Sequence, residues 1–415
     1  MIAVEDAIAI ILVNTAPLPV ASVPLATALG LVLAVDVHAT APQPPFPAAV
    51  VDGFALRAAD GDLPRRLIGE QTAGYVADLE VQPGTAVRIT TGAPIPSGAD
   101  AVVKVEQSDE LDGWVTPHPG QLLHPGLGIR PIGSDVQTGE RALAAGQVLG
   151  PAELGMLASL GLPDAPVHRR PVVGVFSTGD ELVDPGKALA LGQIYDSNRP
   201  TLLAAVAQAG GTPLDLGIAR DRPGELERLV ARGLAEADVL VTSGGVSMGE
   251  LDLLKPLLER WGQVLFGRVL MKPGKPLTFA MLPARDAPGT VAVDWPPRPV
   301  FALPGNPVSS LVTFQLFVRP AIRRLLGYRQ TGLPQVMARL GHEFRLDPER
   351  PEYHRVTLRR EGDGFVAVST GSQASSRLLS ATGANGLLVL EQAAGVLPAG
   401  SERTVLMLDE LWLAD

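Results

Sequence analysis

Short apolar runs alternate with helix-like stretches between residues 171 and 327. Each run has the length of one buried strand, and a polar or glycine-rich turn follows most of them. This alternation predicts a parallel sheet that is covered by helices on both faces. The predicted strands are 171–176, 213–219, 238–242, 263–271 and 300–303. The predicted helices are 201–210, 223–237, 250–262 and one that starts at residue 307.

Two other regions have the pattern of β domains. Residues 38–138 contain short β-like runs between Pro, Gly and Asp turns, at 86–90, 101–105 and 114–117. Alternating runs after residue 333 predict a second β domain, with strands at 356–358, 366–368, 386–390 and 404–408. The proline-rich stretch 283–299 is expected to be a surface loop.

The chain is therefore predicted to be a multidomain α/β plus β protein. The expected domains are an α/β domain (1–18 and 169–327), a connecting domain (19–37 and 139–168), a small β-rich domain (38–138) and a C-terminal β domain (328–415). Residues 1–13 have the pattern of an amphipathic helix, and 151–160 that of a second helix.

Composition excludes several classes of protein. With 46% hydrophobic and 19% charged residues, the 415-residue chain is not globally disordered, and its 45 Gly and 38 Pro indicate many tight turns. A net charge of −10 and 4% aromatic residues argue against a nucleic-acid partner. The absence of Cys excludes disulfides and thiol catalysis. No run of 18 apolar residues predicts a membrane span, so we expect a cytoplasmic protein.

Two turns that follow predicted strands combine small residues with acids. Asp180 and Glu181 lie in the turn 177–182, and the segment 192–198 follows shortly after it. A glycine-rich turn at 242–252 contains Ser247 and Asp252. Such turns expose N–H groups to an oxyanion, and their carboxylates suit a divalent cation. The alternative is ordinary turn and helix-capping chemistry.

Two further turns are rich in proline. Lys272 and Lys275, two of only five lysines, are held three residues apart in the turn 271–276, which favours anion binding. The strand at 301–303 leads through a proline turn to a helix start that includes Ser309. All four turns are expected at one edge of one sheet, where parallel α/β proteins bind ligands, so a phosphate or oxyanion site is predicted there.

Three polar residues mark turns of the small β-rich domain. They are Asp52, Thr91 and Asp135. Taken alone, each is typical of a turn residue that bonds to its own backbone.

These strings together resemble the molybdopterin molybdenumtransferases, the bacterial counterparts of the gephyrin E domain. The strings are Asp-Gly-Phe-Ala (52–55), Thr-Gly-Ala-Pro-Ile-Pro (91–96), Ser-Thr-Gly-Asp-Glu-Leu (177–182), Ser-Gly-Gly-Val-Ser (243–247), Lys-Pro-Gly-Lys-Pro (272–276) and Leu-Pro-Gly-Asn-Pro-Val-Ser (303–309). They follow the order and spacing of that family over nearly the whole chain.

The resemblance implies an elongated homodimer whose central α/β domain binds molybdopterin. The implied reaction inserts molybdate into adenylylated molybdopterin and releases AMP, with Mg²⁺ as cofactor. The active site would lie where the α/β domain of one protomer faces the β-rich domain of the other. Other proteins of molybdenum-cofactor biosynthesis are the further partners implied.

The resemblance also assigns site residues. Catalytic positions would be Asp52, Thr91, Asp135, Glu181, Asp221 and Asp252. Positions for molybdate or the pterin phosphate would be Ser247, Arg268, Lys272, Lys275, Pro304, Pro307, Ser309, Arg355 and Ser375. We expect Asp52, Glu181 and Asp252 to divide metal binding and water positioning between them.

Two alternatives stay open at this point. A molybdopterin adenylyltransferase shares the α/β domain but has no need of residues 19–170 or of a C-terminal β domain. A non-catalytic scaffold of the gephyrin type is the other, although this sequence contains no fused partner domain and no long disordered linker.

Overall fold

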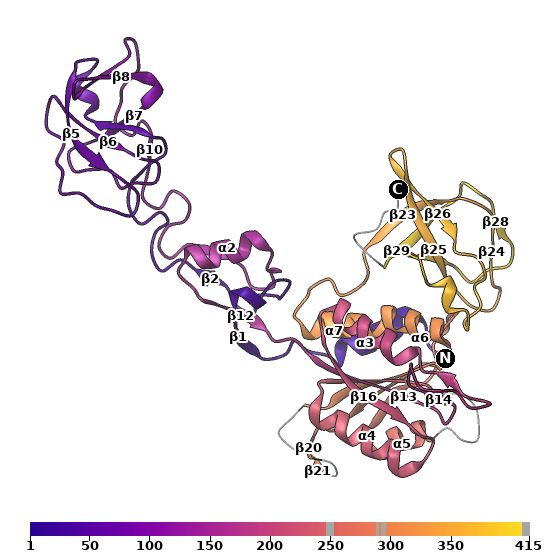
Figure 1. Cartoon of the computed structure of the whole chain (residues 1–415). Helices are drawn as coiled ribbons and strands as arrows, with labels where there is room; N and C mark the ends of the chain where they lie inside the picture. The colour runs from indigo at the N-terminus through magenta and orange to yellow at the C-terminus, as the bar shows by residue number, and fades with distance from the viewer. Residues whose placement is uncertain (246–252, 288–289, 292–295, 409–415) are drawn as a thin grey trace. The chain divides into compact units, whose positions relative to one another are not determined.

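The computed structural model describes residues 1–245, 253–287, 290–291 and 296–408 of the chain (Figure 1). Its contacts divide the chain into two compact units. The first unit comprises residues 1–21, 30–34 and 166–415, and the second comprises 22–29 and 35–165. The chain passes from one unit to the other within β1 (Val20–Pro24) and β12 (Asp164–His168), which pair with each other.

A six-stranded sheet forms the centre of the first unit, in the order β16-β13-β17-β22-β19-β18. The first four of these strands are parallel, and β19 runs antiparallel to β22. β18 pairs antiparallel with β19, so it runs in the same direction as the first four strands. The strands are β13 (Val172–Thr178), β16 (Thr212–Ala219), β17 (Val239–Ser243), β18 (Gln263–Phe266), β19 (Thr278–Leu282) and β22 (Arg298–Leu303). Two short pairs accompany the sheet: β14 (Leu182–Val183) with β15 (Ile194–Tyr195), and β20 (Arg285–Ala287) with β21 (Thr290–Val291).

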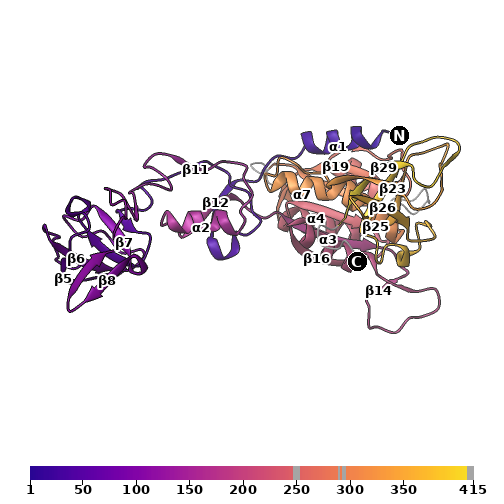
Figure 2. The same cartoon turned by 90° about the horizontal axis from the view of Figure 1, so that it is seen from above.

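Helices cover both faces of this sheet, as the apolar runs predict. In Figure 1, α4 and α5 lie below the sheet, and α3, α6 and α7 lie above it. In Figure 2, α1 lies alongside α7, which it contacts. The helices are α1 (Val4–Val13), α3 (Asn198–Ala209), α4 (Pro223–Glu236), α5 (Leu254–Trp261), α6 (Pro307–Thr313) and α7 (Arg319–Leu325), with a π-helical stretch Phe314–Val318 between the last two.

Burial explains why these segments take these conformations. Every residue of β17 is buried, as expected for a central strand with helices on both faces. In α4, the leucines at 226, 229 and 234 recur at helical spacing and pack with Phe176 and Leu240 of the sheet in one apolar core.

A closed barrel, β23-β26-β25-β27-β29, completes the first unit. Its strands are β23 (Gln335–Leu340), β25 (Glu352–Glu361), β26 (Gly364–Ser369), β27 (Gly386–Leu390) and β29 (Glu402–Met407), beside the pair β24 (Phe344–Arg345) and β28 (Val396–Leu397). The second β domain expected after residue 333 is therefore present as a barrel.

The second unit contains another six-stranded sheet, in the order β7-β4-β6-β5-β9-β8. Its strands are β4 (Gly53–Leu56), β5 (Arg65–Gln71), β6 (Thr85–Ile89), β7 (Ala101–Lys104), β8 (Ser108–Leu111) and β9 (Trp114–Pro117). The unit also contains the pairs β2 (Val37–His38) with β11 (Arg141–Leu143) and β3 (Ala48–Ala49) with β10 (Ile129–Arg130). Its helices are α2 (Pro151–Ser159) and three short 3-10 helices, Leu25–Thr27, Ala58–Asp60 and Val105–Gln107.

Three details of the predicted pattern are wrong. The strand predicted at 263–271 ends at Phe266, and an antiparallel strand, β19, that was not predicted returns beside it. The reason is that Gly267 interrupts the run, and Pro273 and Pro276 lie in the connection through which the chain turns back to β19. The stretch 283–299 contains the paired strands β20 and β21, so it is not only loop. The helix predicted at 250–262 begins at Leu254, so Leu253 precedes it, and residues 250–252 lie outside the described residues.

Candidate functional site

A cavity of about 550 Å³ lies at the carboxyl ends of β13, β17 and β22. Its walls come from the turn after β13, the segment that leads from β15 into α3, the turn after β17, the turn before α6, and Ser376 of the C-terminal region. This is the edge at which parallel α/β sheets bind ligands. Three of the four predicted turns therefore meet in one cavity.

One side of the cavity is acidic. Glu181 and Asp221 both line it, and Asp180 is the neighbour of Glu181. Burial, and then the negative charges of Asp180 and Glu181, raise the pKa of Asp221. Arg220 Nη1 donates to the carbonyl oxygens of Asp180 (2.8 Å) and Leu182 (3.0 Å), so a guanidinium holds the turn that carries Glu181. The chain has thus concentrated negative charge at this edge, which is the condition for binding a cation.

The facing side offers hydroxyl and backbone N–H groups. Gly244 and Gly245 have φ angles of +89° and +69°, a left-handed conformation that favours glycine. A Cβ at Gly244 would lie 2.8 Å from the carbonyl oxygen of Thr178 and 2.9 Å from its Oγ1, so no side chain fits there. Within the described part of the chain, the buried Thr178 Oγ1 has no hydrogen-bond partner. A buried hydroxyl without a partner beside a glycine turn is suited to an oxyanion.

Asn198 connects two of these turns. Its Nδ2 donates to Ser243 Oγ at 2.6 Å and to the carbonyl oxygen of Gly305 at 2.7 Å. Ser243 ends β17, and Gly305 follows β22, so one amide group spans the ends of two neighbouring strands. One side chain at the start of α3 therefore links two turns of the cavity wall.

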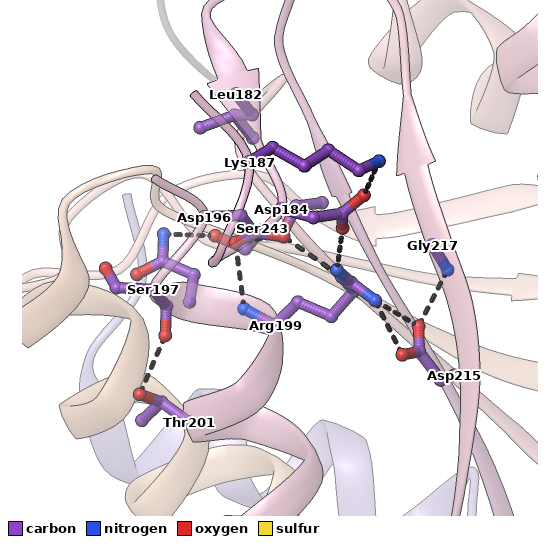
Figure 3. A network of polar contacts seen from close by, with 12 residues as sticks. Leu182, Asp184, Lys187, Asp196, Ser197, Arg199, Thr201, Asp215, Gly217 and Ser243 are labelled. Carbon is purple, nitrogen blue, oxygen red and sulfur yellow. Dashed lines mark hydrogen bonds and ion pairs between the residues drawn. The ribbon is translucent and has the colours of Figure 1, made fainter. Parts of the chain in front are cut away.

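Arg199, the next residue, lies at the centre of an ion-pair network (Figure 3). Its guanidinium contacts Asp184 at 2.5 Å, Asp196 at 3.0 Å and Asp215 at 2.5 Å. Asp196 is only 1% exposed, and it also accepts a hydrogen bond from Ser177 Oγ at 3.0 Å. The network joins β13, β16 and the β14–β15 pair behind the cavity wall.

The C-terminal region contributes the loop 372–376. Asn306 Nδ2 donates to Ser375 Oγ at 3.0 Å, and the backbone N–H of Val308 donates to the Ser375 carbonyl at 3.1 Å. Arg355, which is 2% exposed, donates from Nη2 to the Ala374 carbonyl at 3.3 Å and to Ser380 Oγ at 3.0 Å. Burial lowers the pKa of Arg355 to about 10. The guanidinium thus holds this loop against the start of α6.

Comparison with known proteins identifies the family. Three family models match the chain in succession: "MoeA N-terminal region (domain I and II)" at residues 2–161, "Probable molybdopterin binding domain" at 174–324, and "MoeA C-terminal region (domain IV)" at 337–408. The chain is 37% identical to a molybdopterin molybdenumtransferase of Haemophilus influenzae, over 92% of both chains. The chain belongs to the molybdopterin molybdenumtransferase family.

Other relatives agree with this assignment. A gephyrin of Dictyostelium discoideum is 41% identical over 91% of this chain, which spans only 58% of that gephyrin's length. A crystal structure of a molybdopterin biosynthesis MoeA protein from Pyrococcus horikosii has a TM-score of 0.81 at 30% identity and covers 99% of both chains.

The positions that the molybdenumtransferase resemblance assigned are only partly brought together in the first unit. Glu181, Asp221 and Pro307 line the cavity. Ser375 bonds to Asn306 in its wall. Ser309 is buried in the first turn of α6, two residues after Pro307, and Pro304 lies in the turn before this helix. Ser247 and Asp252 lie outside the described residues.

The assigned basic residues lie at the same sheet edge but do not line the cavity. Thr278 of β19 pairs with Ala302 of β22, so the turn that precedes β19 lies beside the end of β22. Neither Arg268, Lys272 nor Lys275 is among the described residues that line the cavity. The Lys272 ammonium contacts Glu352 at 2.5 Å and Asp347 at 3.1 Å, and the hydrogen bond to Glu352 raises the pKa of Lys272.

Two of the assigned residues pair with each other in the second unit. Asp52 Oδ1 accepts hydrogen bonds from the backbone N–H of Thr91 (2.7 Å) and from its Oγ1 (2.9 Å), which lower the pKa of Asp52. Asp135 forms an ion pair with Arg130 at 2.7 Å. The sequence alone indicated that Asp52 and Thr91 are separate turn residues. In the structure, the two residues are joined by two hydrogen bonds.

The Asp52–Thr91 contact gives a prediction. Thr91→Ala removes one of the two hydrogen bonds to the carboxylate, so the pKa of Asp52 should rise toward its ordinary value. A pH titration of the aspartate carboxyl carbons by NMR measures this. Thr90→Ala, at the neighbouring residue whose hydroxyl accepts from Ala73, is the matched control and should leave the Asp52 titration unchanged. Equal titrations in both variants would refute the assignment.

The sequence motifs did not identify Asp196, Asn198 and Arg199 as site residues. The signal was present in the segment 192–198, which was noted only as following the first turn. Within the described ranges, no three His, Cys, Asp or Glu side chains are grouped to hold a metal ion. No described helix combines the length and apolar composition needed to cross a membrane.

Proposed function

We propose that this chain transfers molybdenum, supplied as molybdate, to molybdopterin. The observation that carries the proposal is the cavity at the carboxyl edge of the sheet, where hydroxyl and glycine turns face an acidic wall. A substrate that combines phosphate groups with a bound cation complements both walls at once. The family of the chain supports the same reaction.

We further propose that the substrate is the adenylylated form of molybdopterin and that AMP leaves. The phosphoanhydride of this form carries negatively charged oxygens, to which the backbone N–H groups of the Gly244–Gly245 turn and the Thr178 hydroxyl can donate hydrogen bonds. In this proposal the protein binds and orients the phosphates, and the walls of the cavity exclude bulk water from the bond that breaks.

Mg²⁺ is proposed as the cofactor, and the residues fit it. Burial, and then the charges of Asp180 and Glu181, raise the pKa of Asp221, and a divalent cation would relieve the repulsion between these carboxylates. Mg²⁺ is commonly held by one or two carboxylates together with substrate phosphates and water. Glu181 and Asp221 would hold it from the first unit, and Asp52 and Asp252 stay predicted ligands. When bound, it would neutralise charge on the leaving phosphate.

A homodimer and a cytoplasmic location belong to the same proposal. Both follow from the resemblance and the composition described above. Asp52 and Thr91 are proposed to serve this reaction from the β-rich domain, with Asp52 ionised because of its two hydrogen bonds.

The test is AMP release from adenylylated molybdopterin by the full chain in Mg²⁺, with and without molybdate. We expect release that depends on both molybdate and Mg²⁺. Consumption of ATP when bare molybdopterin is supplied, without molybdate-dependent release, would instead identify an adenylyltransferase. No reaction in either assay would overturn the proposal.

A further inference from the structure

The side-chain amide of Asn198 has a defined orientation. One of its contacts is the carbonyl oxygen of Gly305, at 2.7 Å, and a carbonyl oxygen can only accept a hydrogen bond. The amide nitrogen must therefore face Gly305, where it also reaches Ser243 Oγ at 2.6 Å. Both contacts use Nδ2, so Oδ1 is the polar atom of this side chain that is left for a ligand.

This oxygen belongs to a residue of the cavity wall. Asn198 lines the cavity and is partly buried. Among the described residues, no donor contacts its Oδ1 at hydrogen-bond distance. Asn198 Oδ1 thus adds a neutral acceptor to a cavity in which Glu181 and Asp221 carry charge and the glycine turns present donors. Such an atom suits an uncharged N–H group and not a phosphate.

The backbone that carries Asn198 is firmly held. Asp196, two residues earlier, is 1% exposed and bonds to Ser177 Oγ and to the backbone N–H of Arg199 (3.1 Å). The Arg199 guanidinium then bonds to Asp196, Asp184 and Asp215, as Figure 3 shows. An acceptor fixed on both sides in this way needs little reorganisation to bind a ligand.

We propose that Asn198 is a recognition residue whose Oδ1 accepts a hydrogen bond from an amino or ring N–H group of the substrate's nitrogen heterocycle. This inference rests on the proposed function, because that substrate carries two such heterocycles, a pterin and an adenine. Both present the same chemistry, an amino group on an aromatic ring. Ser243 and Gly305 hold the amide in place, and Arg199 acts through Asp196 as a positioning residue.

Pairs of ligands that differ in one amino group provide the test. AMP is compared with purine riboside 5′-monophosphate, which lacks the 6-amino group, and 6-methylpterin is compared with 6-methyllumazine, in which the 2-amino group is replaced by a carbonyl. Dissociation constants are measured by calorimetry for the full wild-type chain and for Asn198→Ala and Asn198→Ser. Thermal unfolding confirms that each variant is folded, and the serine variant keeps a small polar group if the alanine variant is unstable.

We expect the wild-type chain to favour one amino ligand over its analogue by about 3- to 10-fold, the worth of one neutral hydrogen bond. In a folded Asn198 variant, this preference for the amino ligand should disappear, and the affinities for the other pair should stay unchanged. The pair that is affected identifies the heterocycle that Asn198 contacts. An equal loss of affinity for both members of each pair, or an unchanged preference, would show that Asn198 only cross-links the wall and would overturn the inference. Failure of the wild-type chain to bind any of the four ligands would instead count against the proposed function.

Discussion

Glu181→Gln is expected to slow molybdate-dependent AMP release by about 100-fold, the size of effect seen when one group of a metal-binding or charge-stabilising site is removed. Glutamine keeps the size of the side chain but removes its charge from the acidic wall. Since the charge of Glu181 contributes to the raised pKa of Asp221, the variant should also lower that pKa. The acid limb of the pH–rate profile, which we assign to Asp221, should therefore move to lower pH.

The control for this prediction is Glu236→Gln. Glu236 is an exposed residue near the end of α4 that pairs with Arg232 at 2.9 Å, so its loss should leave AMP release unchanged. Raising the Mg²⁺ concentration should restore part of the activity of Glu181→Gln. It should not change the activity of Glu236→Gln relative to that of the wild-type chain. Full activity of Glu181→Gln at low Mg²⁺ would contradict a role for Glu181 in this site.

Arg199→Ala is expected to lower the free energy of unfolding of the first unit by about 3 kcal/mol, because removal of one partner leaves a buried charge without compensation. The charge in question is Asp196, which is 1% exposed. Arg199→Lys should cost less, since an ammonium keeps the charge but cannot bridge three carboxylates in the same geometry. Denaturant unfolding followed by circular dichroism gives the free energies of unfolding of the wild-type chain and of the two variants.

Arg232→Ala is the matched comparison for Arg199→Ala. Arg232 forms an exposed ion pair with Glu236, four residues later on the same helix, and such pairs contribute less than about 1 kcal/mol. An equal loss of unfolding free energy in the two alanine variants would show that the buried network around Arg199 stabilises the fold no more than an exposed ion pair does.

The α/β part of the fold was predictable because its signals are local. The strand predicted at 171–176 is β13, Val172–Thr178, and the helix predicted at 223–237 is α4, Pro223–Glu236. Each is a single continuous segment. Its apolar periodicity and the Pro or Gly residues at its ends can be recognised without knowledge of the segments that it packs against. The stretch 263–282 failed because two short antiparallel strands separated by a proline turn have the same composition as one strand and a loop.

The candidate site was predictable in its place but not in its contacts. Turns that follow parallel strands meet at one sheet edge, and Glu181 and Pro307 do line one cavity there. Lys272 was expected to be an anion ligand, yet its ammonium is held by Glu352 and Asp347, which lie some 80 residues further along the chain. No local pattern reveals such a pairing.

The sequence alone determined the alternation of strands and helices, the edge of the sheet at which ligands bind, and, through six short strings, the family. These are properties of consecutive residues, set by burial periodicity and turn chemistry. Only the tertiary structure decided which side chains meet: Thr91 with Asp52, Arg199 with three aspartates, and Asn198 with the ends of β17 and β22. Most of these contacts join residues that are distant in the sequence and that the fold brings together, so no pattern of consecutive residues reveals them.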